Sequence, residues 1–114
     1  MPKWPLDKKF NPDYLVGREL IQLCIGQFEL QFNFHPASNF TVFHKLQLRG
    51  SVDEKWEHGQ VPENTALSKL LGQRVAEVTI EAADGLCIRF LSGDTIEVFT
   101  QSDYESYTLD GVVV

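Results

Sequence analysis

Residues 70–99 read LLGQRVAEVTIEAADGLCIRFLSGDTIEVF, and they contain most of one folding unit. Apolar residues alternate with polar ones in three short runs, which is the period-two pattern of half-buried strands. Two turns separate the runs, at Asp84-Gly85 and at Ser92-Gly93-Asp94, where glycine tolerates the positive φ of tight hairpins. The stretch predicts an antiparallel meander of three strands.

A short helix is expected before this meander. Asn64 offers a side-chain oxygen to the free amide hydrogens of a first helical turn. Gly72 can take the left-handed conformation that commonly ends a helix. We therefore predict about two turns of helix between these residues.

The same pattern occurs earlier in the chain. Asn11 is a suitable cap and Pro12 suits the first position of a helix that ends at Gly17. Duplication of one helix-plus-meander unit and convergence of two meanders both explain the likeness. We predict a single domain over residues 1–114, with pseudo-repeats at about 11–49 and 64–110 and a linker at 50–63. The match holds at one constant offset, with Leu15, Gly17, Leu20, Leu23 and Ile25 corresponding to Leu70, Gly72, Val75, Val78 and Ile80.

Length and composition agree with an ordinary globular domain. The chain has 114 residues, of which 43% are hydrophobic. A chain of this size buries about two-thirds of its unfolded surface, so it needs neither a disulfide nor a metal for stability. Cys24 and Cys87 are expected to be buried free thiols. No apolar run is long enough for a signal sequence or a membrane span, so we expect a cytoplasmic location.

The predicted fold is α+β and mainly antiparallel β. We expect about seven or eight strands, rolled into a half-barrel or a sandwich, with two short helices. This arrangement lets the alternating strands share one apolar interior and protects their edges.

The linker, GSVDEKWEHGQVPE over residues 50–63, has no convincing period. One interpretation is a solvated connection whose Trp56 packs into the core. The other is a recognition loop, because tryptophan among polar groups is typical of binding hot spots. Its acidic residues are Asp53, Glu54, Glu57 and Glu63.

The segment QSDYESYTL, residues 101–109, predicts a final strand with Glu105 on the same face as Tyr107 and Leu109. Glu105 could accept hydrogen bonds from loop amides at the start of the strand. It could also be a buried carboxylate with a raised pKa. Asp103 and Glu105 extend the set of candidate partner-binding residues.

The charge is unevenly divided along the chain. Residues 1–49 carry six Lys and Arg against four Asp and Glu, whereas residues 50–114 carry four against twelve. The net charge is −6 and the isoelectric point is about 4.9. Nucleic-acid binding is disfavoured, because phosphate recognition requires basic groups. A basic protein partner is favoured, since complementary charge accelerates association.

The sequence lacks the usual catalytic motifs. It has no Gly-rich phosphate loop, Cys-x-x-Cys pair, His-Glu-x-x-His or Gly-x-Ser-x-Gly elbow. His35 and His44 flank one turn and could approach each other, but a zinc site needs three or four ligands. We therefore expect a non-enzymatic protein with no metal and no cofactor.

The closing Tyr104-Glu105-Ser106-Tyr107, with Leu15-Val16-Gly17 and Leu70-Leu71-Gly72, resembles a family of small uncharacterised bacterial domains. In size, acidity and strand content the chain is also loosely similar to immunity proteins of bacterial toxin systems. This second resemblance implies an inhibitor of a cationic toxin such as a nuclease, and a homodimer is compatible with it. The alternative is a small-ligand-binding β-barrel or a minor enzyme that uses the barrel interior.

Overall fold

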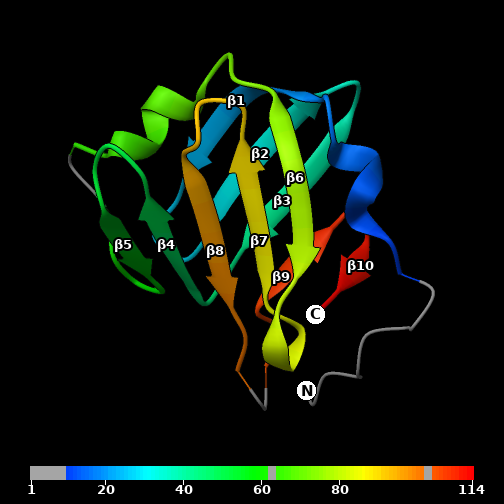
Figure 1. Cartoon of the computed structure of the whole chain (residues 1–114). Coiled ribbons are helices and arrows are strands. Elements are labelled where there is room, and N and C mark those ends of the chain that lie inside the picture. The colour runs from blue at the N-terminus through cyan, green and yellow to red at the C-terminus, as the bar shows by residue number, and fades with distance from the viewer. Residues whose placement is uncertain (1–9, 62–63, 102–103) are drawn as a thin grey trace.

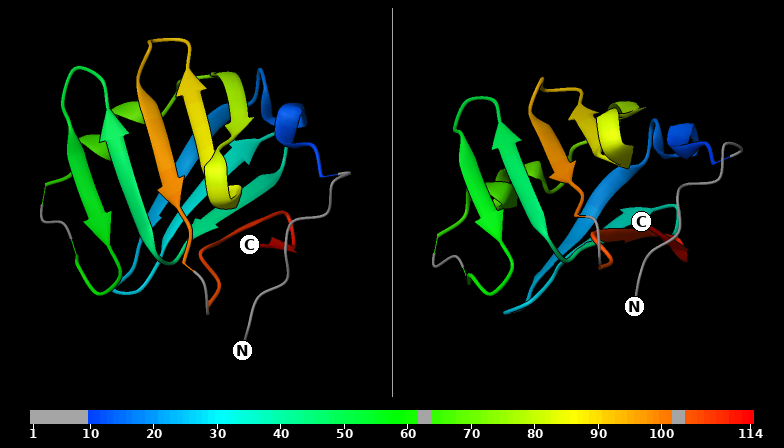
Figure 2. Two further views of the ribbon diagram at one scale, coloured as in Figure 1. Left: turned by 60° about the horizontal axis from the view of Figure 1, so that its bottom comes forward. Right: turned by 90° about the horizontal axis from the view of Figure 1, so that it is seen from below.

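The computed structural model describes residues 10–61, 64–101 and 104–114, and in this part of the chain ten strands form two antiparallel sheets of five strands each (Figure 1). The two sheets lie face to face as two layers (Figure 2). The elements in chain order are η1 (Pro12–Leu15), β1 (Glu19–Ile25), β2 (Leu30–His35), β3 (Ser38–Val42), β4 (Lys45–Arg49), β5 (Glu54–Glu57), η2 (Ala66–Leu70), β6 (Val75–Ile80), η3 (Ala82–Asp84), β7 (Leu86–Phe90), β8 (Thr95–Phe99), β9 (Tyr107–Leu109) and β10 (Val112–Val113).

Each half of the chain contributes strands to both sheets. The first sheet has the order β1-β2-β3-β9-β10, and the second has the order β5-β4-β8-β7-β6. The chain crosses from the first sheet to the second between β3 and β4, and returns between β8 and β9. The hairpin that follows each meander therefore pairs with the meander of the other half.

Large apolar side chains fill the space between the sheets. The Phe40 ring lies 5.8 Å from the Phe32 ring and 5.5 Å, edge to face, from the Tyr107 ring. All three are buried, and the Tyr107 hydroxyl donates to the carbonyl oxygen of Asp84 at 3.0 Å. The interior is thus a solid core, with aromatic pairs in the geometry that stabilises them.

The backbone repeats at the predicted offset of 55 residues. The amide of Gly17 donates to the carbonyl of Val75 at 2.8 Å, and the amide of Gly72 donates to the carbonyl of Leu20 at 2.7 Å. β1 and β6 each carry a bulge, between Leu20 and Gln22 and between Val75 and Glu77. We call these paired segments, residues 17–20 and 72–75, the clasp. The equivalent bonds within it follow the pseudo-twofold relation that the sequence pattern suggests, and duplication of the unit stays a prediction.

Gly17 and Gly72 should be equally sensitive to alanine. Their φ angles are +86° and +85°, and a Cβ added at either position would meet no heavy atom within 4 Å. The loss therefore comes from backbone conformation alone, and we expect each substitution to lower the free energy of unfolding by about 1–2 kcal/mol. Urea denaturation of G17A, G72A and G26A measures this, since Gly26 has no positive φ. Clearly unequal losses for G17A and G72A would contradict the equivalence.

Asp94 connects three turns near the tip of the β7–β8 hairpin. Its carboxylate accepts from the Ser92 hydroxyl at 2.9 Å, the Gln73 amide at 3.4 Å and the Ser51 backbone amide at 3.3 Å. These hydrogen bonds, that of Ser92 first, lower the pKa of Asp94.

This lowered pKa predicts an acid-sensitive contribution to stability. The contribution is present above the unfolded-state pKa, about 3.9, and is lost as the pH falls through the lower pKa of the folded state. We expect D94N to cost about 1 kcal/mol or less at pH 7 and to lose less stability than the wild type between pH 7 and pH 3. Urea unfolding at both pH values is the measurement, and an equal loss in both proteins would show that Asp94 does not contribute.

Several sequence predictions are confirmed at the level of local structure. The protein is mainly antiparallel β, as predicted. Asn11 caps η1 by accepting from the Asp13 amide at 2.9 Å, and Pro12 is the first residue of that element.

Other predictions need correction. The described helical elements are short 3-10 turns rather than α-helices, and the described residues form ten strands instead of the predicted seven or eight. Thr65 caps η2 in place of Asn64, because its hydroxyl accepts from the Leu67 amide at 3.1 Å. The expected linker contains β5, which completes a hairpin with β4.

Candidate functional site

Four exposed or half-buried glutamates form a group that we call the acidic end: Glu57 ends β5, Glu81 follows β6, Glu105 precedes β9 and Glu97 lies in the middle of β8. β5, β6 and β8 all end at the same end of the second sheet, with β5 and β6 at its two edges (Figure 1). The chain also crosses between the sheets at this end (Figure 2). The acidic end is therefore built from segments that are far apart in the sequence.

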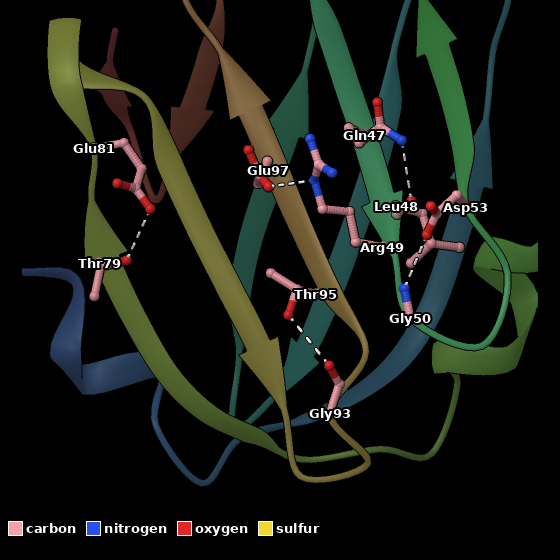
Figure 3. Close-up of polar contacts among 10 residues, drawn as sticks. All are labelled: Gln47, Leu48, Arg49, Gly50, Asp53, Thr79, Glu81, Gly93, Thr95 and Glu97. Atoms are coloured by element: carbon pink, nitrogen blue, oxygen red, sulfur yellow. Dashed lines mark hydrogen bonds and ion pairs between the residues drawn. The ribbon is translucent and has the colours of Figure 1, made fainter.

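A cavity of about 430 Å³, the side pocket, lies between the η3 segment and the end of β8. Glu81 and Glu97 both line it, together with Phe99 and Thr100. The Thr79 hydroxyl donates to Glu81 at 3.4 Å, and Arg49 Nε lies 2.6 Å from a Glu97 carboxylate oxygen (Figure 3). The negative charge of Glu97 is thus partly balanced by an exposed ion pair, which contributes little to stability.

Cys87 lies beside these two glutamates. Partial burial, followed by the negative charges of Glu81 and Glu97, raises the pKa of the Cys87 thiol. A raised pKa disfavours the thiolate, which is the nucleophilic form of cysteine. Cys24 and Cys87 are free thiols, as expected, but they are half-buried rather than fully buried.

A second cavity, the corner pocket, has a volume of about 470 Å³ and lies where the two sheet crossings meet. The amides of Phe43 and His44 both donate to the carbonyl oxygen of Ser106, at 2.9 and 3.3 Å. These bonds join the β3–β4 crossing to Ser106, which precedes β9, beside the pocket. The described lining consists of Phe43, His44, His58, Gln101, Tyr104 and Glu105.

His58 is held in the corner pocket by three contacts. Its ring Nδ1 lies 2.7 Å from the carbonyl oxygen of Phe43, and its backbone amide donates to the His44 carbonyl at 2.9 Å. The Phe28 ring lies 5.0 Å from the imidazole ring. Phe28 belongs to the β1–β2 turn, so this turn packs against His58.

Gln101 is hydrogen-bonded to Glu105 and Ser106 beside the pocket. The Gln101 amide donates to the buried Ser106 hydroxyl at 2.8 Å, and the Gln101 side-chain amide donates to the Glu105 carbonyl at 3.2 Å. Ser106 is therefore a structural residue, and its hydroxyl is already used as an acceptor.

Exposed aromatic rings accompany the carboxylates. The exposed fractions are 52% for Phe28 and 62% for Tyr104. Lys45 Nζ lies 5.4 Å from the centre of the Phe99 ring and 3.8 Å from a Glu57 oxygen. A surface with aromatic rings and acidic groups is suited to recognising a cationic partner.

The structure divides the predicted partner-binding residues into two groups. Glu57 and Glu105 are exposed at the acidic end. Asp53 and Glu54 lie at the opposite end of β5, where Asp53 accepts from the Gly50 amide at 3.3 Å. In Figure 3 Asp53 lies beside Gly50 at one side of the view, and Glu81 lies at the other side. Glu63 and Asp103 lie outside the described residues.

Glu54 and Trp56, which were predicted to bind a partner, have structural roles. The Glu54 carboxylate accepts from the Thr65 hydroxyl and, at 3.2 Å, from the Ala66 amide, so it holds the start of η2. Trp56 is only 2% exposed, and its indole nitrogen donates to the Gln60 carbonyl at 2.8 Å. Its indole is in the core, so it does not present the exposed surface that a recognition loop requires.

Glu105 is exposed and precedes β9, so the interpretation as a buried carboxylate is wrong. The final strand was predicted to include Glu105, but β9 starts only at Tyr107.

Among the described residues, no group of three His, Cys, Asp or Glu side chains is placed to hold a metal ion.

The sequence pattern did not identify Glu81, Glu97 and Phe99, which line the side pocket, or His44, which lines the corner pocket with Glu105. Glu97 lies in the middle of β8, Phe99 ends that strand, Glu81 follows β6 and His44 lies in a crossing, so only the order of the strands in the sheets determines which of them meet. The only indication of these positions in the sequence was the short connection, without hydrophobic periodicity, on each side of a predicted strand.

Within the described ranges, no helix has the length and apolarity required to cross a membrane. Comparisons with protein-family models, with curated proteins and with solved structures find no match.

Proposed function

We propose that the chain is a non-catalytic protein-binding module, of the type represented by immunity proteins, that neutralises a cationic bacterial toxin such as a nuclease. The observation that supports this function best is the acidic end, where Glu105 and the exposed Tyr104 ring line the corner pocket, Glu81 and Glu97 line the side pocket, and the exposed Glu57 ends β5. We place the partner interface there, and not on the whole set of acidic residues between Asp53 and Glu63.

The negative net charge of the chain favours association of this interface with a basic partner. A chain with a net charge of −6 attracts a basic surface over a distance of about one Debye length, roughly 8–10 Å in physiological salt. Exposed aromatic rings then supply the contact area at short range. Active sites that act on phosphodiesters are rich in basic groups, so an acidic protein can cover them.

The alternative is a small-ligand-binding protein or a minor enzyme. Aromatic side chains fill the interior between the sheets, which disfavours a ligand site there. The one observation in favour of this alternative is the corner pocket, which is large enough for a small molecule.

Affinity capture from a lysate of the source organism at low salt tests the proposed function. We expect the wild type to retain a basic protein that elutes as the salt concentration rises, and the E57K/E105K variant to lose it. D13K/D53K is the matched control, since it changes the net charge equally at exposed positions away from the acidic end. Failure of the wild type to retain any basic protein, or equal loss with both variants, would count against this interface.

A further inference from the structure

The corner pocket presents hydrogen-bond acceptors. The carbonyl oxygen of Phe43 can only accept, so His58 Nδ1, 2.7 Å away, must carry the proton of this contact. In the neutral ring the lone pair is then on Nε2. His58 therefore offers an acceptor nitrogen on a ring whose tautomer is fixed by the backbone.

Gln101 and Glu105 add further acceptors. The Gln101 side-chain nitrogen donates to the Glu105 carbonyl at 3.2 Å, which identifies the other end of this amide as the oxygen, an acceptor. The Glu105 side chain is exposed, and an ionised carboxylate has only acceptor oxygens. Together these groups place one negative charge and several lone pairs around the cavity.

The remaining described lining includes two aromatic rings. Phe43 is half-buried in the wall of the pocket, and Tyr104 is 62% exposed beside it. Aromatic faces attract cations, and they stack best on a planar guanidinium group. The pocket thus combines a carboxylate, neutral acceptors and aromatic faces.

We infer that the corner pocket binds a guanidinium group. Guanidinium is planar and positively charged, and it carries five N–H donors and no acceptor in an arginine side chain. The planar face matches the aromatic rings of the described lining, the positive charge matches the Glu105 carboxylate, and the N–H donors match the acceptor atoms of His58 and Gln101. This inference rests on the proposed function in so far as the guanidinium is an arginine of the basic partner; a free guanidinium compound has the same chemistry.

The test uses Nα-acetyl-L-argininamide as the probe and Nα-acetyl-L-citrullinamide as its uncharged analogue of the same shape. Titration of the full chain is followed in ¹H–¹⁵N correlation spectra. We expect the arginine probe to shift the Gln101 side-chain amide and the backbone amides of His58 and Glu105. The citrulline probe should bind about tenfold more weakly, since it lacks the charge. Equal binding of the two probes would overturn the inference.

Two variants locate the site. E105Q keeps the shape of an exposed side chain and should weaken the arginine probe by about five- to tenfold. E81Q is the matched control in the side pocket and should leave binding unchanged. Y104A should also weaken binding, through loss of an aromatic face. If E81Q weakens binding and E105Q does not, the guanidinium binds in the side pocket and the inference is wrong.

The outcomes for the two proposals are distinguishable. If the arginine probe binds with the expected dependence on Glu105 but no basic protein is captured, the guanidinium site stands with a small molecule as its source, and the proposed function falls. If a basic protein is captured through the acidic end but E105Q and Y104A leave its affinity unchanged, the proposed function stands and the guanidinium site falls.

Discussion

Replacing Trp56 with alanine should lower the free energy of unfolding by about 3–5 kcal/mol. The indole is 2% exposed and lies opposite Leu46 in the β4–β5 pair, on the core side of the sheet. Its removal leaves a large cavity and also frees the carbonyl oxygen of Gln60. Urea denaturation followed by circular dichroism is the measurement.

W56F is the control for this experiment. Phenylalanine keeps an aromatic ring in the core but cannot donate to Gln60, so we expect a loss of about 1–2 kcal/mol. If W56A were as stable as the wild type and instead failed to retain a partner, the recognition-loop interpretation of residues 50–63 would be correct and the core role assigned to Trp56 would be wrong.

Reversing Glu57 and Glu105 together should slow association with the captured basic partner by about 10- to 100-fold at low salt. Both carboxylates are exposed at the acidic end, and each change to lysine replaces an attraction by a repulsion. The dissociation rate should change less, because long-range charge acts mainly on the encounter. Stopped-flow association rates at a series of salt concentrations measure the effect.

The salt dependence separates a local effect from one of total charge. The wild type should lose much of its rate advantage as the salt concentration rises, whereas E57K/E105K should depend only weakly on salt. D13K/D53K should retain most of the wild-type rate. Equal slowing in the two double variants would show that net charge alone controls association and that the acidic end is not the contact surface.

The local features of this fold could be predicted from the sequence. Each depends on residues that are close together in the chain, as with the Asn11 cap, the positive φ of Gly72 and the alternation over β7. The 55-residue offset also predicted equivalent positions in the two halves, and the clasp shows matching hydrogen bonds at those positions.

The remaining features depend on long-range pairing. β5, β9 and β10 are only two to four residues long, which is too short to show a period. They form because β4, β3 and β9 provide strand edges, and no local pattern specifies these partners. The strand count was too low for this reason.

Only part of the candidate site could be predicted, because its residues too are brought together by long-range pairing. Acidic composition identified Glu57 and Glu105, but closeness in sequence also grouped Asp53 and Glu54 with them. A hairpin places residues a few positions apart at opposite ends of a strand, because a strand rises about 3.3 Å per residue. The backbone crossings then bring Glu105 beside His58, which no spacing rule predicts.

The exchange of hairpins between the halves has a consequence for synthesis on the ribosome. β3 is made from residues 38–42, yet its partner β9 comes from residues 107–109, so 64 residues are translated between the two strands. The edge of β3 therefore stays open while the rest of the chain is translated. An open edge is a template for pairing with other nascent chains, so we expect this domain to be most prone to aggregation before β9 leaves the ribosome.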